Sequence, residues 1–250
     1  MLGADEPGLE HLLLGAHANL PPISLVHSLI ALESGDEYRA HLERAAGGAR
    51  HPFILVVEGS VMDDALAGAG AFSRLGSDGD TPITTTTWIE RLAPRAAAVV
   101  AIGSCATWGG IPAAAGNPTG AHGLGAHLGS AFRSRAGLPV VNIPGCAPSG
   151  EVFIEALASV CLHVLGQVPV ELDDRGQPRW LYSEPTSPRP PRTGHRSEPD
   201  ASVTVRCPVP STGWMKGIGG CANVGGACIG CTAPDFVDRL VPLSRPSWPS

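Results

Sequence analysis

Four cysteines near the end of the sequence have the residue type and the spacing of metal ligands. They follow the pattern C-x13-C-x6-C-x2-C, at Cys207, Cys221, Cys228 and Cys231. Most residues between them are glycine or other small residues, so this segment has little capacity to form an ordinary helix or strand. Four thiolates bind either zinc or an iron–sulfur cluster. Structural zinc sites usually use two closely spaced cysteine pairs, and only Cys228 and Cys231 form one. The spacing therefore favours a cluster over zinc or unligated thiols.

Two more cysteines each follow a predicted buried strand. Cys105 comes three residues after the apolar run at 97–102, and Cys146 comes three residues after the run at 138–143. Parallel strands bring their carboxyl ends to one edge of a sheet, where ligands bind. The glycines and prolines around both cysteines predict loops that expose the backbone. We therefore expect Cys105 and Cys146 to be metal ligands rather than buried thiols.

The pattern that positions these cysteines is an alternation of short apolar strands with helices. Thr84 supplies a hydroxyl at the start of one helix, and Gly47 and Gly48 end another. Continuous apolar strands separated by helices are typical of a parallel sheet covered on both faces. The expected fold class is α/β, with a flavodoxin-like parallel sheet domain plus a small, irregular, cysteine-rich iron–sulfur domain. Strands are predicted at 53–57, 97–102 and 138–143, an extended piece at 21–27, and helices at 34–46, 84–93 and 151–165.

Changes in composition divide the chain into three regions. Residues 1–172 form the flavodoxin-like domain with the loops that carry the first two candidate ligands. Residues 173–206 read as a proline-rich linker, in which 180–182 is a brief extended piece. Residues 207–250 form the cysteine-rich, cluster-binding segment. Cys161 lies on the apolar face of the last predicted helix, and we interpret it as a core residue.

The other titratable residues give weaker signals. Glu58 follows the first strand at the same sheet edge, where it could relay protons or brace a loop. His195 lies in the proline-rich linker, where a solvated surface histidine is the default. The remaining histidines are scattered without i,i+4 pairing, so no role is assigned to them. The sequence contains no Walker loop, nucleophile elbow or dinucleotide motif, so nucleotide and hydrolase chemistry have no support.

Composition limits the remaining classes of protein. The chain has 250 residues, of which 43% are hydrophobic and 16% charged, enough to bury a sizeable core. Its net charge is −6 without a basic stripe, which argues against nucleic acid as a partner. The sequence shows no signal peptide, and the longest apolar stretch, at 96–102, is too short to span a bilayer. The clustered cysteines suit a reducing compartment, so we expect a cytoplasmic protein; peripheral association with a membrane through partners is compatible with this.

With these residues in place, the sequence resembles the small, electron-transferring subunit of nickel–iron hydrogenases over nearly its whole length. The matching pieces are residues 56–60, 101–113, 117–120, 142–146 and 213–236. The last of these, which contains Cys221, Cys228 and Cys231 among glycines, is similar to the actinobacterial high-affinity, oxygen-insensitive branch.

The resemblance implies an electron relay. A partner large subunit would carry the nickel–iron site and split dihydrogen, and electrons would pass through clusters in this chain to an external acceptor. Cys105 and Cys146 match ligands of the proximal cluster, and the four C-terminal cysteines match those of the medial cluster. Many members of the family bind a three-iron medial cluster because proline replaces one cysteine. Cys221 is a thiol here, which implies a four-iron, four-sulfur (4Fe-4S) medial cluster.

Two departures from the family pattern accompany this expectation. The family's early Cys-x-x-Cys type motif, which supplies two further proximal ligands, is missing because no cysteine precedes Cys105. A misplaced or truncated start would explain that incomplete ligand set. His195 stands where the distal-cluster motif begins, but Glu198 takes the place of its cysteine, so the distal cluster is expected to be absent.

Two alternatives to the electron-transferring subunit stay open. One is a truncated or degenerate hydrogenase-like paralogue that acts as an iron–sulfur binding or scaffold module without turnover. The other is the cluster-bearing subunit of respiratory NADH dehydrogenases, which shares the flavodoxin-like half. The C-terminal four-cysteine segment argues against this second relative.

Overall fold

The computed structural model describes residue 23, residues 36–48 and 52–182, two short strands at 185–186 and 205–206, residue 207, and residues 230–234. Several predictions lie outside the described residues: the extended piece at 21–27 apart from Ile23, His195 in the linker, and the ligands Cys221 and Cys228. The remaining candidate ligands are all described.

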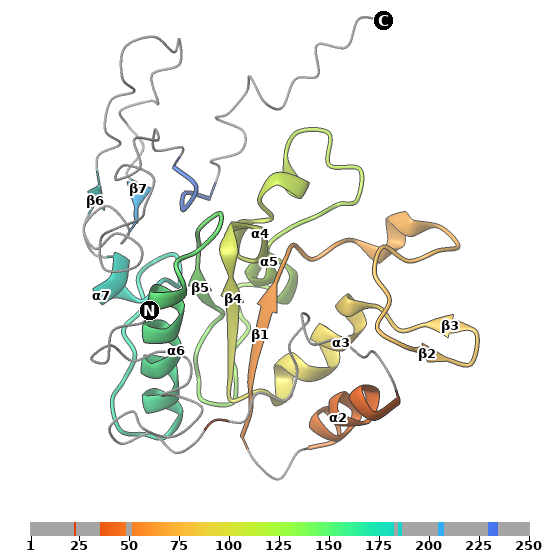
Figure 1. Ribbon diagram of the computed structural model, residues 1–250, viewed down its shortest axis with the longest axis horizontal. Helices are drawn as coiled ribbons and strands as arrows, with labels where there is room; N and C mark the ends of the chain where they lie inside the picture. Colours follow the sequence, from red (N-terminus) through yellow and green to blue (C-terminus); the bar gives the residue numbers. More distant parts are fainter. Residues whose placement is uncertain are drawn as a thin grey trace, which may run out of the picture.

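The centre of the molecule is a parallel sheet of three strands. It consists of β1 (Ile54–Glu58), β4 (Ala98–Ile102) and β5 (Val141–Ile143), in the order β1-β4-β5 (Figure 1). Val100 of β4 pairs with Val56 on one side and with Val141 on the other. The predicted parallel α/β fold is therefore confirmed.

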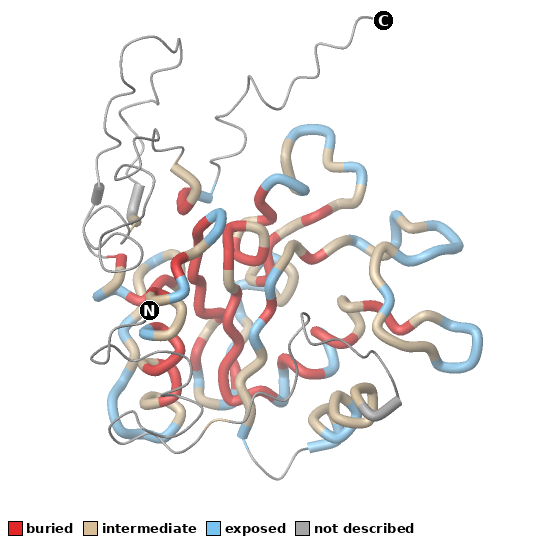
Figure 2. Tube along the Cα trace, in the orientation of Figure 1, coloured by how far each residue is buried: buried red, intermediate tan, exposed pale blue. Residues whose placement is uncertain are grey.

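Both faces of the sheet are covered, as the apolar strands predict. Along β4, Ala98 and Val100 pack toward helix α6 (Gly150–Val164), whereas Val99 and Ala101 pack on the opposite face toward α3 (Thr85–Leu92). Side chains of a strand alternate between the faces of its sheet, so each face of β4 contributes to a separate cluster. Figure 2 shows β4 and β5 as the continuously buried part of the sheet.

The remaining elements are short and surround this centre. Helix α4 (Gly103–Trp108) follows β4 directly, and α5 (Leu124–Leu128) comes after η4 and a further loop. The other described elements are α2 (Asp36–Ala46), η2 (Asp64–Ala67), β2 (Ser77–Asp78), β3 (Thr81–Pro82), η3 (Ala93–Arg95), α4 (Gly103–Trp108), η4 (Ile111–Ala113), α5 (Leu124–Leu128), α7 (Arg179–Tyr182), β6 (Pro185–Thr186) and β7 (Val205–Arg206).

The predicted helix ends are confirmed by their capping groups. The hydroxyl of Thr84 accepts a hydrogen bond from the backbone N–H of Thr87, which satisfies one of the unpaired donors at the start of α3. Helix α2 stops at Gly47 and Gly48, and Gly48 has a φ of 99°, a left-handed conformation that glycine adopts without strain. Gly166, with a φ of 71°, follows the end of α6 in the same way.

Two segments differ from their predicted conformation. The predicted loop at 103–108 is helix α4, because Gly103 has a φ of 86° and turns the chain directly from β4 into a helical turn. The predicted strand at 138–143 is shorter, because β5 begins at Val141; Pro139 has no N–H to donate to a sheet.

The packed part of the α/β domain also continues past the predicted boundary near residue 172. Residues 179–182 form helix α7 rather than an extended piece. Tyr182 is 2% exposed and belongs to the same apolar cluster as β4, β5 and α6. Burial of a large aromatic side chain outweighs the polar, proline-rich character of the neighbouring sequence.

Candidate metal centre

Cys105 and Cys146 lie at the carboxyl edge of the sheet, as predicted from their positions after β4 and β5. Cys105 is half-buried in α4, and Cys146 is exposed in the loop between β5 and α6. Burial raises the pKa of the Cys105 thiol, a backbone hydrogen bond from Ile111 lowers it, and the nearby Cys146 and Glu58 raise it. The two sulfurs are therefore close enough to influence each other. Glu58, exposed at the end of β1, is part of the same neighbourhood.

Gly110 packs directly against Cys105. A β-carbon at Gly110 would lie 2.6 Å from Cys105 Sγ and 2.9 Å from Cys105 Cα, and the backbone φ of 55° is left-handed. No other residue type fits this position without moving the thiol. The glycine pair after α4 thus fixes where the sulfur lies.

Ser104 joins three cysteine-bearing segments through one buried hydroxyl. It is 1% exposed, and its Oγ donates a hydrogen bond to the carbonyl of Cys231. The same oxygen accepts a hydrogen bond of 3.0 Å from the backbone N–H of Gly145, next to Cys146. The Ser104 backbone N–H donates to the Gly145 carbonyl at 3.0 Å. Cys105, Cys146 and Cys231 are therefore linked by the residue that precedes the first of them.

Trp108 adds a second attachment for the C-terminal segment. Its indole Nε1 donates a hydrogen bond of 3.1 Å to the carbonyl of Thr232. Thr232 and Ala233 are each 2% exposed, so residues 230–234 are packed onto α4 rather than merely near it. A single short helix thus holds both Cys105 and the segment of Cys231.

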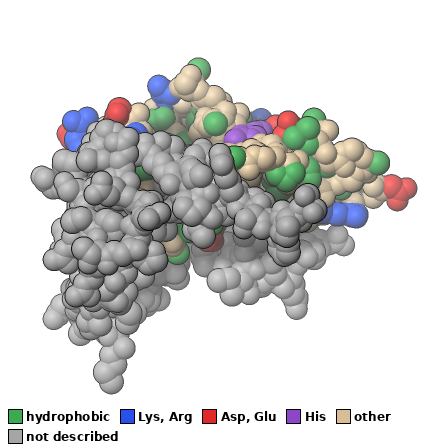
Figure 3. Space-filling view, turned by 90° about the horizontal axis from the view of Figure 1, so that it is seen from above, with side chains coloured by type: hydrophobic (Ala, Val, Ile, Leu, Met, Phe, Trp, Pro, Cys, Tyr) green, Lys and Arg blue, Asp and Glu red, His purple; other side chains and the backbone are tan. Residues whose placement is uncertain are grey.

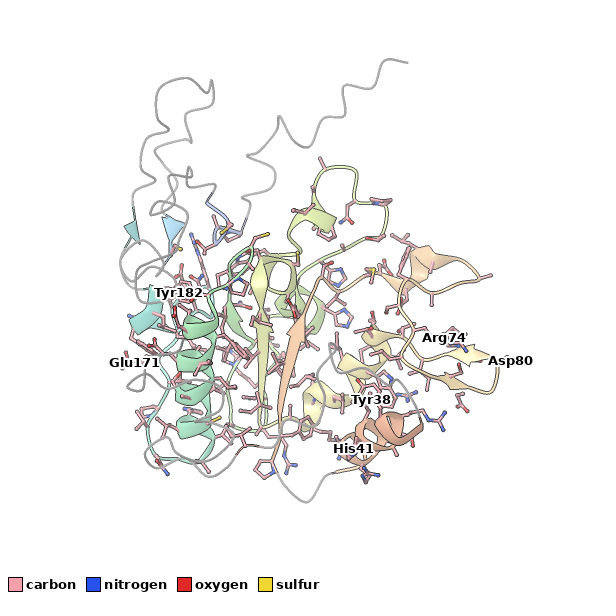
Figure 4. All side chains as sticks on the ribbon, viewed as in Figure 1. Tyr38, His41, Arg74, Asp80, Glu171 and Tyr182 are labelled. Carbon is pink, nitrogen blue, oxygen red and sulfur yellow. The ribbon has the colours of Figure 1, made fainter. Side chains whose placement is uncertain are left out.

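Tyr182 lies near both groups of cysteines. Its hydroxyl donates a hydrogen bond of 3.2 Å to the carbonyl of Pro144, two residues before Cys146. Burial raises the pKa of the Tyr182 phenol strongly, and the neighbouring Cys207 and Cys231 raise it further. Figure 4 labels Tyr182 on α7, beside α6. Sequence reasoning missed this role, because the tyrosine belongs to no motif and precedes a polar, proline-rich stretch.

The Ser104 junction can be tested by removing its hydroxyl. Ser104→Ala should lower the free energy of unfolding by about 1–3 kcal/mol, because the Gly145 N–H loses its partner in a buried position and the Cys231 carbonyl loses its donor. The matched control is Ser159→Ala, whose hydroxyl bonds only the Ala156 carbonyl of its own helix at 2.8 Å. Thermal unfolding of both variants measures the difference. Equal losses for the two would contradict a special role for Ser104.

The donor atoms at this centre fit an iron–sulfur cluster. Cys105, Cys146, Cys207 and Cys231 each offer a sulfur atom, and soft sulfur ligands suit iron–sulfur clusters and zinc. The described thiols fall into two incomplete sets, the first pair at the sheet edge and the second beside Tyr182. Among the described residues, no three His, Cys, Asp or Glu side chains are arranged to hold a metal by themselves. Cys161, in contrast, is buried in α6, and burial raises the pKa of its thiol to about 11. Its burial agrees with the interpretation of Cys161 as a core residue.

Comparisons with known proteins agree with this arrangement. Residues 17–160 match the family described as NADH ubiquinone oxidoreductase, 20 Kd subunit. The fold is similar to a chain of the actinobacterial-type NiFe hydrogenase from Ralstonia eutropha H16, with a TM-score of 0.83 and 40% identity, covering 95% of this chain and 74% of that one. The sequence is 29% identical to the periplasmic [NiFeSe] hydrogenase small subunit of Desulfomicrobium baculatum, over 97% of this chain and 81% of the relative.

A third relative matches a shorter region more closely. The hydrogenase-2 small chain of Escherichia coli K12 is 33% identical over 183 residues, which are 73% of this chain and 43% of the relative. The family match covers more than half of the sequence, and the relatives by sequence are small subunits of hydrogenases. The chain therefore belongs to the family of the NADH ubiquinone oxidoreductase 20 Kd subunit and, within it, to the small subunits of nickel–iron hydrogenases.

Proposed function

We propose that this chain is the electron-transferring small subunit of a nickel–iron hydrogenase, an oxidoreductase that uses dihydrogen as its electron donor. The catalytic nickel–iron site would belong to a large subunit that binds this chain. The observation that supports the proposal best is the junction at Ser104, where one hydroxyl holds the segments of Cys105, Cys146 and Cys231 together. An electron relay needs such a fixed spacing between its cluster sites.

The cysteines divide between two proposed clusters. Cys105 and Cys146 would contribute to a proximal cluster, whose ligand set in this chain is incomplete. A medial 4Fe-4S cluster would be held by Cys207, Cys221, Cys228 and Cys231. Clusters at these sulfurs would accept and release single electrons.

The protein around these thiols supplies neutral hydrogen-bonding groups, the partly buried Trp108 and the buried Tyr182. The Trp108 indole and the Tyr182 phenol are both committed to backbone carbonyls. Such groups exclude water and keep the chain around the thiols in place, and burial and hydrogen bonding are the means by which a protein adjusts a cluster's potential.

Iron analysis of cysteine variants tests the proposal. Cys105→Ala and Cys231→Ala should each lose bound iron and visible absorption, whereas Cys161→Ala should keep both because its thiol is buried in α6. The unaltered chain should hold at least about four irons. Proteins should be purified without air, and hydrogen oxidation with a redox dye should then be measured with and without the large subunit.

The outcomes of this experiment separate the proposal from its alternatives. Iron binding together with hydrogen oxidation in the presence of the large subunit supports the electron-transferring role. Iron binding without turnover in that complex identifies a scaffold module instead. A colourless protein with zinc would contradict both.

The cytoplasm is the location we propose, with peripheral membrane contact only through partners. Among the described residues, no helix is long and apolar enough to cross a bilayer. The Desulfomicrobium baculatum relative is named as periplasmic, so the proposal implies that location differs within the family. Fractionation of cells into cytoplasm, periplasm and membrane decides between these outcomes.

A further inference from the structure

A pair of histidines lies apart from the cysteines, at a pocket of about 310 Å³. His122 precedes α5 in a loop that bridges to Val61, and His127 lies in the last turn of α5. Both line the pocket together with Glu90 of α3. The His127 side chain is 15% exposed and the Glu90 side chain 61%. Figure 3, which views the molecule from above, shows histidine side chains reaching the surface of this face.

The hydrogen bonds of His122 determine which of its nitrogens carries a proton. Its Nδ1 lies 2.7 Å from the carbonyl oxygen of Gly120. A carbonyl oxygen only accepts hydrogen bonds, so Nδ1 of His122 must be protonated. In a neutral ring, the other nitrogen, Nε2, then carries a lone pair. That nitrogen lies 3.2 Å from Nδ1 of His127.

His127 is consequently held between an acceptor and a carboxylate. One proton must lie between His122 Nε2 and His127 Nδ1, because two lone pairs do not attract each other. The remaining nitrogen of His127, Nε2, lies 3.4 Å from Oε1 of Glu90. A bare lone pair there would face a negative oxygen, whereas an N–H would form an ion pair with it. Satisfying all three contacts at once takes three ring protons on two imidazoles, which hold only two when both are neutral.

We propose that His122 and His127 form a proton-binding site, in which the pair holds one proton more than two neutral rings and Glu90 serves as its counter-ion. The chain of contacts starts at exposed Glu90 and ends at the Gly120 carbonyl. A carbonyl accepts a hydrogen bond but cannot pass a proton on. The site therefore stores a proton that exchanges with solvent on the Glu90 side, and it does not conduct one through the protein.

The surroundings of the pocket favour a positive charge. Asp63 and Asp64, from the segment of η2, line the same pocket as Glu90. Asp64 Oδ2 accepts a hydrogen bond of 2.6 Å from the Thr84 hydroxyl, but its Oδ1 is buried with no hydrogen-bond partner. A buried carboxylate oxygen without a partner is costly unless a cation is near. The extra proton on the histidine pair would place a positive charge in the pocket that Asp64 also lines.

The hydrogen-bond partners of His163 fit a ring that carries a single proton. Its Nδ1 accepts a hydrogen bond of 3.2 Å from the Val170 N–H, and its Nε2 faces the Ala136 carbonyl at 3.2 Å. One donor and one acceptor satisfy a single-proton ring completely. His163 therefore serves as an internal reference for the pair.

The test is nitrogen NMR of the full chain with isotope-labelled histidine at neutral pH, with signals assigned from single His→Gln variants. We expect both ring nitrogens of one member of the pair to be protonated, and His163 to carry one proton, on Nε2. Glu90→Gln should remove the third proton from the pair, because it removes the counter-ion. Glu43→Gln, which alters an exposed carboxylate paired with Arg39 on α2, should leave all these signals unchanged.

Three results would overturn the proposal. The first is a pair with two single-proton rings in the unaltered chain. The second is an unchanged third proton in Glu90→Gln. The third is equimolar zinc binding that removes the proton between the two rings, which would make the pair a metal site. None of these readouts depends on the iron–sulfur clusters, so failure here is separate from failure of the proposed function.

Discussion

Gly123→Ala should unfold the chain at a clearly lower temperature than the unaltered protein. A β-carbon at this position would lie 2.2 Å from the carbonyl oxygen of Thr107 and 2.7 Å from its carbonyl carbon. These are backbone atoms of α4, which cannot move aside as the end of a flexible side chain would. Overpacking usually costs about 1–3 kcal/mol, and we expect the upper end or more. For a chain of this size that corresponds to a fall in melting temperature of roughly 6–12 °C.

The matched control is Gly125→Ala, two residues further along in α5. No heavy atom lies within 4 Å of a β-carbon there, and the position is helical. Alanine is favoured over glycine in a helix by about 1 kcal/mol, so this variant should be as stable as the unaltered chain or slightly more stable. Calorimetry of both variants measures the contrast. If Gly123→Ala melts together with Gly125→Ala, α4 and the start of α5 are not in the close contact described.

Gly110→Ala should remove iron that depends on Cys105. The new methyl group would be 2.6 Å from the sulfur and 2.9 Å from Cys105 Cα, so either the thiol or the backbone of α4 has to shift. The φ of 55° with a ψ of −149° adds about 1–3 kcal/mol of strain for any residue other than glycine. We expect an iron content as low as that of Cys105→Ala, measured together with visible absorption on protein purified without air.

Gly116→Ala separates displacement of the thiol from backbone strain. Gly116 lies a few residues later in the same connection and has a left-handed φ of 98°, but its β-carbon would meet no atom within 4 Å. It should therefore carry a similar strain and retain its iron. Equal iron loss in the two alanine variants would mean that strain in the loop, and not pressure on Cys105, governs binding.

The α/β centre of the fold could be predicted from the sequence because its signals are local. The apolar run that became β4 is buried on both faces, and α3 carries its cap and its apolar residues within ten positions. The helix at 103–108 could not be predicted in the same way. Its course depends on the backbone of Gly103, and the glycines that bracket it suggested a loop.

The position of the candidate ligands at the sheet edge could be predicted, but the hydrogen bonds that connect their segments could not. Cysteine spacing and strand ends identified Cys105 and Cys146. The hydrogen bond from Ser104 to Cys231 joins residues 127 positions apart, and no local pattern encodes such a contact. The pair of His122 and His127 was missed because a spacing of five residues does not place two side chains on one face of a helix. The two side chains meet because His122 lies in the loop before α5, whereas His127 lies within the helix.

The attachment of residues 230–234 to α4 also has a consequence for the order in which the protein is made. The indole of Trp108 donates its hydrogen bond to the carbonyl of Thr232, which is 124 positions later in the chain. A chain folds from its N-terminal part as it is synthesised, so the sheet and α4 form while that carbonyl does not yet exist. The surface around Ser104 and Trp108, to which residues 230–234 bind, is then open to solvent. The proposed ligand Cys105 therefore lacks its link to the Cys231 segment until synthesis of the chain reaches that segment.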